Sequence, residues 1–186
     1  MADLYVALVH HPILNKGGQV VTTSVTNFDL HDLARNCRTF DVKKLFIVTP
    51  SEPQLAMVDY IKEYWHDGWG ASYNPDRKQA FDILQGAPSV ENTTLTIKEL
   101  SGTSPVLVAT TAKKHEKSVA YTGVRELLKG QKPVLLIFGT GHGLTEEFLN
   151  STDQILDPIY GASDYNHLPV RSAVAIILDR LRSQWD

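Results

Sequence analysis

The sequence predicts an α/β fold, a mostly parallel sheet flanked by helices, and three observations lead to this prediction. Short apolar runs rich in β-forming residues recur along the chain, amphipathic segments at helical spacing separate them, and several of those segments carry helix-end signals. The 186 residues are 42% hydrophobic, which is enough for one sizeable core, and the composition shows no break. We therefore expect a single domain over residues 1–186.

The elements follow from the same patterns in chain order. The expected strands are 4–9, 44–49, 94–100, 105–111, 133–139 and 153–156, and the expected helices are 29–40, 52–67, 75–87, 118–130 and 167–185. Asp29 is expected to cap the first helix, Pro53 and Pro75 to begin two others, and Gly130 to end one. The stretch 67–76 is the longest turn-rich segment, so we expect a flexible surface loop there.

Composition excludes several classes of protein. A net charge of −3 with 21% charged residues describes neither a polybasic arm nor an acidic disordered tail. Cys37 is the only cysteine, so an intrachain disulfide and a cysteine-based zinc site are excluded, and we expect a cytoplasmic protein. No apolar stretch approaches the length of a membrane span, so no membrane partner is expected. His142 and His167 lack metal-ligand partners at useful spacing, so no metal site is expected.

A glycine loop follows the 133–139 run with the spacing G-x-G-x-G. In parallel sheets ligands bind beyond the carboxyl ends of the strands, which selects the loops that begin at residues 110, 139 and 157. Glycines at 139, 141 and 143 would let the backbone turn sharply and approach a ligand closely. A tight turn without any ligand is the alternative for the glycines alone.

The residues around this loop limit the ligand. Gly143 is followed by Leu144 rather than by the lysine of a phosphate-binding P-loop, which excludes that motif. A dinucleotide fingerprint needs a different glycine spacing, although Asp157 follows at a suitable distance and keeps this alternative open. Glu146 and Glu147 at the next helix start would repel a pyrophosphate. An adenosine-containing cofactor without phosphates fits better.

Three segments resemble the motifs of the SPOUT, or α/β-knot, RNA methyltransferases, which use S-adenosylmethionine (SAM). Residues 33–50 are similar to the first motif, 133–144 to the second and 157–178 to the third. The loop "GTGHGL" at 139–144 is most similar to that of the tRNA guanine-N1 methyltransferases. The ribose-methylating branch usually has an asparagine where Pro169 falls, so the methylated atom and the RNA stay open.

The resemblance implies a fold, a cofactor and partners. It implies a deep trefoil knot at the C-terminal end, a homodimer with the helix around 172–181 in its interface, and structured RNA, tRNA or rRNA, as substrate. It also implies that backbone groups of the three loops hold SAM. Carried over by position, the cofactor-binding residues are Thr110, Thr111, Gly139, Thr140, Gly141, Gly143, Ile159, His167, Leu168 and Pro169.

Arg35 matches the first-motif arginine, whose guanidinium the resemblance places near the acceptor as a catalytic residue. The alternative is a surface arginine that pairs with Asp29 or Asp32. His10 and His11 could accept a proton, or could simply end the first strand in a turn. A local phosphate-binding surface could form from Arg38, Lys43, Lys44, Lys113, Lys114 and Lys117. Two other functions stay open: a knot protein that binds SAM or RNA without turnover, and a dinucleotide-dependent enzyme that uses Asp157.

Overall fold

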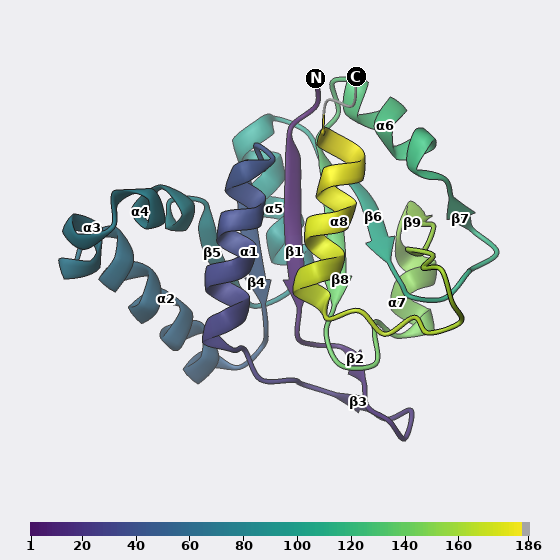
Figure 1. Cartoon of the computed structure of the whole chain (residues 1–186), viewed down its shortest axis with the longest axis horizontal. Helices are drawn as coiled ribbons and strands as arrows, with labels where there is room; N and C mark the ends of the chain where they lie inside the picture. Colours follow the sequence, from purple (N-terminus) through teal and green to yellow (C-terminus); the bar gives the residue numbers. More distant parts are fainter. Residues whose placement is uncertain (184–186) are drawn as a thin grey trace.

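A parallel sheet crosses the centre of the protein, as the computed structural model in Figure 1 shows. The structure describes residues 1–183. Within them, seven strands pair in the order β5-β4-β1-β8-β6-β9-β7, and all these pairs are parallel. The strands are β1 (Leu4–Val9), β4 (Lys44–Val48), β5 (Leu84–Ala87), β6 (Val106–Thr110), β7 (Ser118–Val119), β8 (Val134–Gly139) and β9 (Gln154–Leu156). The predicted α/β fold class is confirmed.

Helices cover both faces of this sheet because side chains on each strand alternate between two hydrophobic cores. One core lies under α1 (Asn27–Thr39), α6 (Tyr121–Lys129) and α8 (Val170–Arg182) and includes Leu4, Val6 and Leu8 of β1. The other lies under α5 (Val90–Ser101) and α7 (Glu146–Ser151) and includes Tyr5, Ala7 and Val9 of the same strand. With both faces covered, the central strands are apolar throughout, which is why the sequence identifies them.

The first helix begins two residues earlier than predicted, and its cap is a different residue. Thr26 is the N-cap, and its hydroxyl accepts a hydrogen bond from the backbone N–H of Asp29. Asp29 is the third helical residue, and its carboxylate accepts from the backbone N–H of Thr26 at 3.2 Å. The two residues form a capping box, so the expected cap at Asp29 is wrong by three positions. Pro53, Pro75 and Gly130 stand at helix ends as predicted.

Two predicted elements near the middle of the chain are wrong. The expected strand at 94–100 lies inside α5, where Ser89 caps the helix and Gly102 ends it in a left-handed conformation. Threonines made this segment resemble a strand, but Thr93 and Thr94 donate their hydroxyls to carbonyls one turn back and fit the helix. Burial at 90, 93 and 97 gives it a helical spacing.

The expected helix at 75–87 is two elements. Helix α4 (Pro75–Phe81) ends early, and after two turn residues Leu84–Ala87 form β5 beside β4. The expected flexible loop at 67–76 contains α3 (Trp69–Tyr73), which follows α2 (Glu52–His66). Gly70 fixes this turn, because a β-carbon there would lie 2.7 Å from the Trp65 ring.

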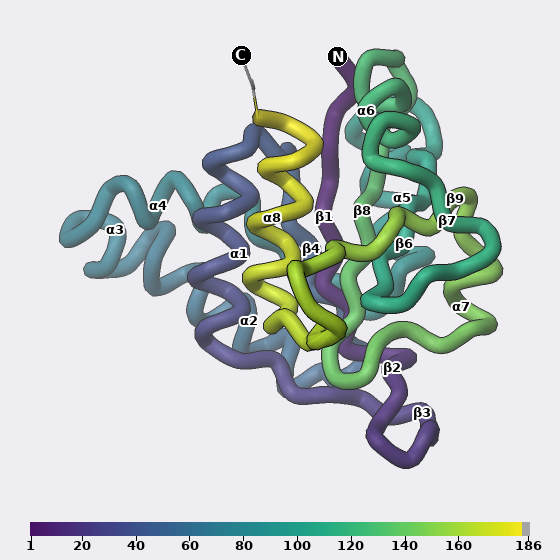
Figure 2. The backbone as a smooth tube through the Cα atoms, turned by 45° about the vertical axis from the view of Figure 1, so that its right-hand side comes forward, coloured from purple at the N-terminus to yellow at the C-terminus, as the bar shows by residue number. Residues whose placement is uncertain are grey.

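The chain returns across the sheet after β9 to reach α8. β9 lies beyond β6 in the strand order, whereas α8 packs against α1, so the intervening segment crosses the carboxyl ends of the strands (Figure 2). Helix α8 buries Val174, Ile177, Leu178 and Leu181 in the core of its own chain. Residues 184 and 185, the last of the predicted helix, lie outside the described residues. The knot stays an expectation.

Candidate functional site

Three loops converge at one edge of the sheet, the one formed by the carboxyl ends of its strands. They follow β6, β8 and β9, which are neighbouring parallel strands, so their carboxyl ends lie together. The first and third loops also contact each other: the Lys114 ammonium pairs with the Asp157 carboxylate, and the Asn166 amide donates to the carbonyl of Ala112 at 2.7 Å. These are the three loops that the sequence selected.

A short hairpin, absent from the predicted elements, supports the glycine loop. It consists of β2 (Ile13–Leu14) and β3 (Val20–Val21) and lies at the same edge of the sheet (Figures 1 and 2). The backbone N–H of His142 donates to the carbonyl of Leu14 at 3.1 Å, and the N–H of Leu14 donates to the carbonyl of Gly143 at 3.0 Å. The signal for it was "ILNKGGQVV", a glycine-containing turn between two apolar pairs.

The three glycines of the loop have different reasons to be glycine. A β-carbon on Gly139 would lie 2.9 Å from the backbone nitrogen of Leu144, so this glycine permits the turn itself. Gly141 has φ +56°, and its β-carbon would lie 2.9 Å from Ile13 and 3.2 Å from the carbonyl of Leu14. The reasoning that Gly141 lacks a side chain to make room for a ligand is therefore wrong, because the hairpin fills that space. Gly143 has φ +99° and open space beside it.

A part-buried polar network joins the end of β1 to the segment after the hairpin and to the glycine loop. The Nδ1 atom of His10 lies 3.0 Å from the hydroxyl of Thr23, which in turn bonds the hydroxyl of Thr140. The Thr140 hydroxyl also donates to the carbonyl of Val9 at 3.1 Å. Thr140, a predicted cofactor contact, therefore commits its side chain to the protein and leaves only its backbone for a ligand.

His10 is fully buried, and burial lowers its pKa to about 4, with a partly opposing effect of Asp29. Among the described residues its Nε2 atom has no hydrogen-bond partner. Because the ring is neutral and out of reach of a substrate, the structure supports the strand-end interpretation of His10 and not the proton acceptor. His11 is exposed, and its Nδ1 atom lies 3.1 Å from the hydroxyl of Thr22.

The ten predicted cofactor residues differ in exposure. Those that are half-buried are Thr110, Thr111, Gly139, Thr140, Gly143 and Ile159, and those that are exposed are Gly141, His167, Leu168 and Pro169. The Thr110 hydroxyl donates to the carbonyl of Ile137 at 3.0 Å, whereas Ile159 packs against the core. The edge thus offers half-buried backbone beside an apolar side chain, an environment suited to a flat, uncharged base.

The charges at this edge fit an adenosyl group better than a dinucleotide. Asp157, the acid that a dinucleotide enzyme would use for the ribose, is ion-paired with Lys114. Glu146 is exposed at the start of α7, where its carboxylate lies 3.4 Å from His115, and Glu147 is exposed beside it. These carboxylates would repel the negative charges of a pyrophosphate. The charges of this edge therefore fit SAM, a cofactor that carries no phosphate.

Arg35 lies exposed on α1, and its expected carboxylate partners are engaged elsewhere. The Arg171 guanidinium lies 3.4 Å from the Asp29 carboxylate and 3.1 Å from that of Asp32. Within residues 1–183 Arg35 has no ion pair, so the interpretation of Arg35 as the partner of Asp29 or Asp32 is wrong. Arg171 was not among the predicted site residues, although it lies within the third motif.

Helix α1 lies directly against the end of the third loop. The Asn36 side chain donates to the backbone carbonyl of Arg171 at 3.4 Å, and Arg171 stands two residues after Pro169. Contacts between α1 and α8 therefore place the helix that carries Arg35 beside the predicted cofactor loop. Sequence distance hid this proximity, because more than 130 residues separate the two segments.

The six cations expected to form one phosphate-binding surface do not lie together. Lys43 precedes β4 and Lys44 begins it, whereas Lys113 and Lys114 follow β6. Because the strands are parallel, the first pair lies at the amino ends of the strands and the second pair at their carboxyl ends. Lys43 is also close to the carboxylates of Asp3 and Asp41, at 3.9 and 3.8 Å.

The described residues form neither a metal site nor a membrane-spanning helix. In the part of the chain that the structure describes, no group of three histidine, cysteine or acidic side chains is placed to hold a metal ion. Over the same residues, no helix combines the length and the apolar character needed to cross a membrane.

Comparison with known proteins decides the family. The sequence profile of a family described as SAM-dependent RNA methyltransferase matches residues 3–183. The chain belongs to the SAM-dependent RNA methyltransferase family. The resemblance to this family and the expected cofactor, SAM, are therefore confirmed.

Relatives of this chain differ in length. It is 39% identical over 183 residues to an uncharacterized protein of Aquifex aeolicus, covering 98% of this chain and 89% of that protein. It is 42% identical over 179 residues to a tRNA (guanine-N(1)-)-methyltransferase of Oleidesulfovibrio alaskensis, covering 96% of this chain and 42% of the relative. Because the match spans under half of that protein, its named activity is not assigned to this chain by similarity alone.

A solved structure supports the fold of this chain. The TrmH/SpoU tRNA modifying enzyme of A. aeolicus superposes with a TM-score of 0.57 and 20% sequence identity, covering 98% of this chain and 75% of that chain. At this identity the similarity shows the fold alone, which is that of the SPOUT methyltransferases. The fold and the family therefore agree from independent comparisons.

Proposed function

We propose that this chain transfers the methyl group of SAM to a nucleotide of a structured RNA. The observation that carries the proposal is the convergence of the loops after β6, β8 and β9 at one sheet edge, in a chain of the SAM-dependent RNA methyltransferase family. tRNA or rRNA is the proposed substrate, and the named activity of the relatives is what favours tRNA.

The cofactor would be held by backbone groups of these loops. The residues proposed to hold it lie at the ends of these strands or in the loops that follow them: Thr110 and Thr111, the glycine loop from Gly139 to Gly143, Ile159, and residues 167–169. Bound SAM supplies an activated methyl group on a sulfonium centre, ready for in-line displacement. The chain contributes position: rigid loops fix the donor, and residues nearby hold the acceptor in line.

Arg35 is the proposed residue for the acceptor side. Its guanidinium is exposed and lacks a carboxylate partner in the described chain, so it is available to bind an RNA phosphate through two parallel hydrogen bonds. The capping box of Thr26 and Asp29 fixes the start of the helix that carries it, and Asn36 ties that helix to α8. Arg35 would therefore orient RNA at the end of the third loop.

The chain is proposed to act as one domain, in a cytoplasmic homodimer with a knotted C-terminal segment. Helix α8 buries one side in its own core but leaves Ser172, Ala173, Ala175 and Ile176 only partly covered. These small and apolar residues adjoin the predicted cofactor loop, so a second copy packed there would lie close to the methyl donor.

Incorporation of labelled methyl groups tests the proposal. Purified protein with isotope-labelled SAM should label bulk bacterial tRNA or rRNA, and nuclease mapping should then find one nucleoside enriched. Arg35→Ala should lower turnover by about tenfold or more without changing SAM affinity, and Arg35→Lys should recover little of it. Lys129→Ala, which removes an exposed lysine of α6 that pairs with Glu126, is the matched control and should stay fully active.

The outcomes separate the parts of the proposal. SAM binding without any label in RNA would indicate a binding protein and contradict methyl transfer. Binding of a nicotinamide dinucleotide in place of SAM would contradict the cofactor. Full activity of Arg35→Ala would remove the role of Arg35 and leave the cofactor site standing.

A further inference from the structure

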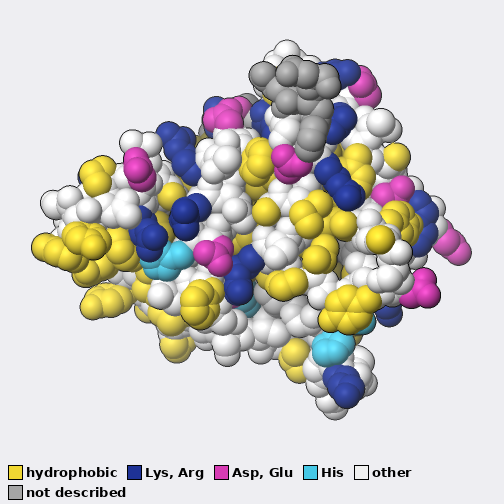
Figure 3. All heavy atoms as spheres, viewed as in Figure 1, with side chains coloured by type: hydrophobic (Ala, Val, Ile, Leu, Met, Phe, Trp, Pro, Cys, Tyr) yellow, Lys and Arg dark blue, Asp and Glu magenta, His cyan; other side chains and the backbone are white. Residues whose placement is uncertain are grey.

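Four aromatic side chains lie exposed at the β5 edge of the molecule, away from the loops that follow β6, β8 and β9. We name them the aromatic surface: Tyr60 and Tyr64 of α2, and Trp69 and Tyr73 of α3, which are 73, 40, 65 and 69% exposed. Figure 3 shows hydrophobic side chains gathered at this end of the protein, over α2, α3 and α4. Exposed aromatic patches of this kind mark binding surfaces.

The rings at the tip of the surface form a ready stack. Trp69 and Tyr73 are one helical turn apart, and their rings lie 4.7 Å apart at an interplanar angle of 19°. Both rings are mostly exposed, so another flat group can extend the stack from outside. Nucleic acid bases are the flat groups that proteins most often bind in this way.

A cluster of ring contacts lies beside this stack, in the helices that adjoin α3. Trp65 packs edge-on against Tyr64 at 5.2 Å and against His31 of α1 at 5.3 Å, and Phe81 of α4 closes the cluster at 4.8 Å from His31. Gly70 fits against the rings of Trp65 and Tyr64. The exposed rings are thus presented by an ordered support rather than by a floppy loop.

Two cations connect the aromatic surface to the proposed acceptor side. The Arg77 guanidinium lies 4.8 Å from the centre of the Trp65 ring and donates to Nδ1 of His31 at 3.1 Å. Arg35 stands one helical turn after His31, and the pKa of His31 is lowered mainly by burial and then by the charges of Arg77 and Arg35, with a partly opposing effect of Asp32. Both cations therefore lie near one imidazole, and within residues 1–183 neither forms an ion pair with a carboxylate.

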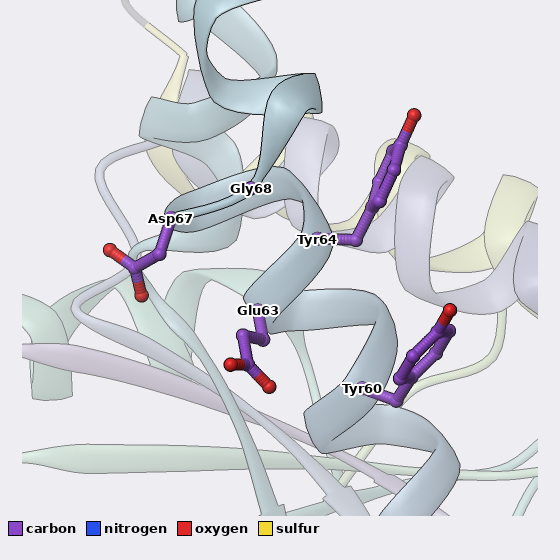
Figure 4. A pocket seen from close by; sticks show the side chains of 5 residues that line it. All are labelled: Tyr60, Glu63, Tyr64, Asp67 and Gly68. Carbon is purple, nitrogen blue, oxygen red and sulfur yellow. The ribbon is translucent and has the colours of Figure 1, made fainter.

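Two acidic side chains near the tyrosines, Glu63 of α2 and Asp67 at its C-terminal cap, point away from them (Figure 4). A shallow depression on this helix is lined by Tyr60, Glu63, Tyr64, Asp67 and Gly68. In Figure 4 the two tyrosines project to one side of the helix, and Glu63 and Asp67 project to the opposite side. The depression has no convergent set of polar groups, which argues against a small-molecule site. The tyrosine side can receive a polyanion without facing these two carboxylates.

We infer that the aromatic surface, together with Arg77 and Arg35, binds unpaired nucleotides of the RNA that this enzyme acts on. Bases stack on Trp69 and Tyr73, while the backbone phosphates lie near the two guanidinium groups. The inference rests on the proposed function in that RNA is the substrate. It adds a second contact region, one that would extend recognition from the methylation site to the β5 edge.

Binding of labelled RNA tests the aromatic part. The probes are bulk bacterial tRNA, a single-stranded oligouridine of about 12 nucleotides and a duplex of the same length, measured by fluorescence anisotropy. The double variant Trp69→Ala/Tyr73→Ala should bind oligouridine and tRNA at least about fivefold more weakly, with little change for the duplex. Leu95→Ala on α5 removes an apolar side chain that is 57% exposed and should bind as the wild type does. Tyr73→Phe keeps the ring and should keep most of the affinity.

Salt dependence tests the cationic part. Arg77→Gln should weaken binding to all three probes. It should also reduce the slope of the logarithm of affinity against the logarithm of salt concentration by about 1, the value for one lost phosphate contact, whereas the aromatic variant should leave this slope unchanged. Lys129→Ala is the control for loss of a cation. Circular dichroism and thermal unfolding confirm that each variant is folded.

Each outcome bears on one claim. If the folded double variant binds the probes as tightly as the wild type does while RNA is still methylated, this inference fails and the proposed function stands. If the wild type binds none of the probes, both fail. If the double variant keeps its RNA affinity but changes from dimer to monomer in sedimentation, the aromatic surface is a protein interface and the inference is overturned.

Discussion

Gly143→Ala is the sharpest perturbation of the proposed cofactor site. Gly143 has φ +99°, and a β-carbon built on it meets nothing within 4 Å. The substitution therefore adds one methyl group toward open space at the sheet edge, without a clash inside the protein. Its effect on stability comes from the backbone alone, because L-residues are strained in this region.

Both expected effects can be given a size. The left-handed backbone should cost about 1–2 kcal/mol of stability, which lowers the Tm of a chain of this length by roughly 2–8 °C. If the cofactor lies against the Gly143 backbone, the methyl group displaces it and removes about one hydrogen bond with its neighbouring contacts. That loss is about 1.4 kcal/mol, or about a tenfold weaker SAM affinity.

Gly102→Ala is the matched control. Gly102 ends α5 with φ +77°, and its β-carbon would also meet nothing within 4 Å. It should cause the same backbone strain and a similar fall in Tm, with unchanged SAM affinity. Titration calorimetry with SAM and a thermal melt of each variant measure the two effects. Equal SAM affinity for Gly143→Ala and the wild type would show that this glycine serves only the turn.

Three further predictions follow. Burial lowers the pKa of His10 to about 4 from an ordinary 6.5, so the unfolded state binds a proton at a higher pH than the folded state does. Urea unfolding should therefore show about 2–3 kcal/mol of stability lost between pH 7 and 4.5. A His10→Gln variant whose stability falls equally steeply with pH would contradict this. Arg171→Met should cost about 1–2 kcal/mol, because the nearly buried Asp29 carboxylate loses its guanidinium; a cost no larger than that of Lys129→Met would contradict it. Sedimentation should show a dimer at micromolar concentration, and a monomer alone would remove α8 from a dimer interface.

The sequence predicted the centre of the fold more accurately than its edges. Strands such as β1 and β8 are buried on both faces, so their apolar runs are continuous and unambiguous. The segment at 94–100 carries threonines that suit either structure, and packing against the sheet decided in favour of α5. β5 has four residues including Gly86, and its state depends on pairing with β4, which no local pattern reveals.

Some features of the candidate site could be predicted from local sequence, and others depend on the fold. Glycine spacing and the polar loops after apolar runs are local, so the sequence alone located the three loops and the family to which they belong. The reason for each glycine is not local: only the fold shows that Gly141 packs against the hairpin while Gly143 faces open space. Likewise, charge pairing is decided by which helices meet.

The sequence by itself determined the fold class, the cofactor family and the edge of the sheet where the loops gather, because each depends on patterns within a short stretch of chain. Tertiary structure alone decided that Arg171 and not Arg35 takes the carboxylates of Asp29 and Asp32, and that Arg77 comes to lie beside His31. Those contacts join residues 46 and more than 130 positions apart, and only the packing of helices on the sheet brings such residues within reach.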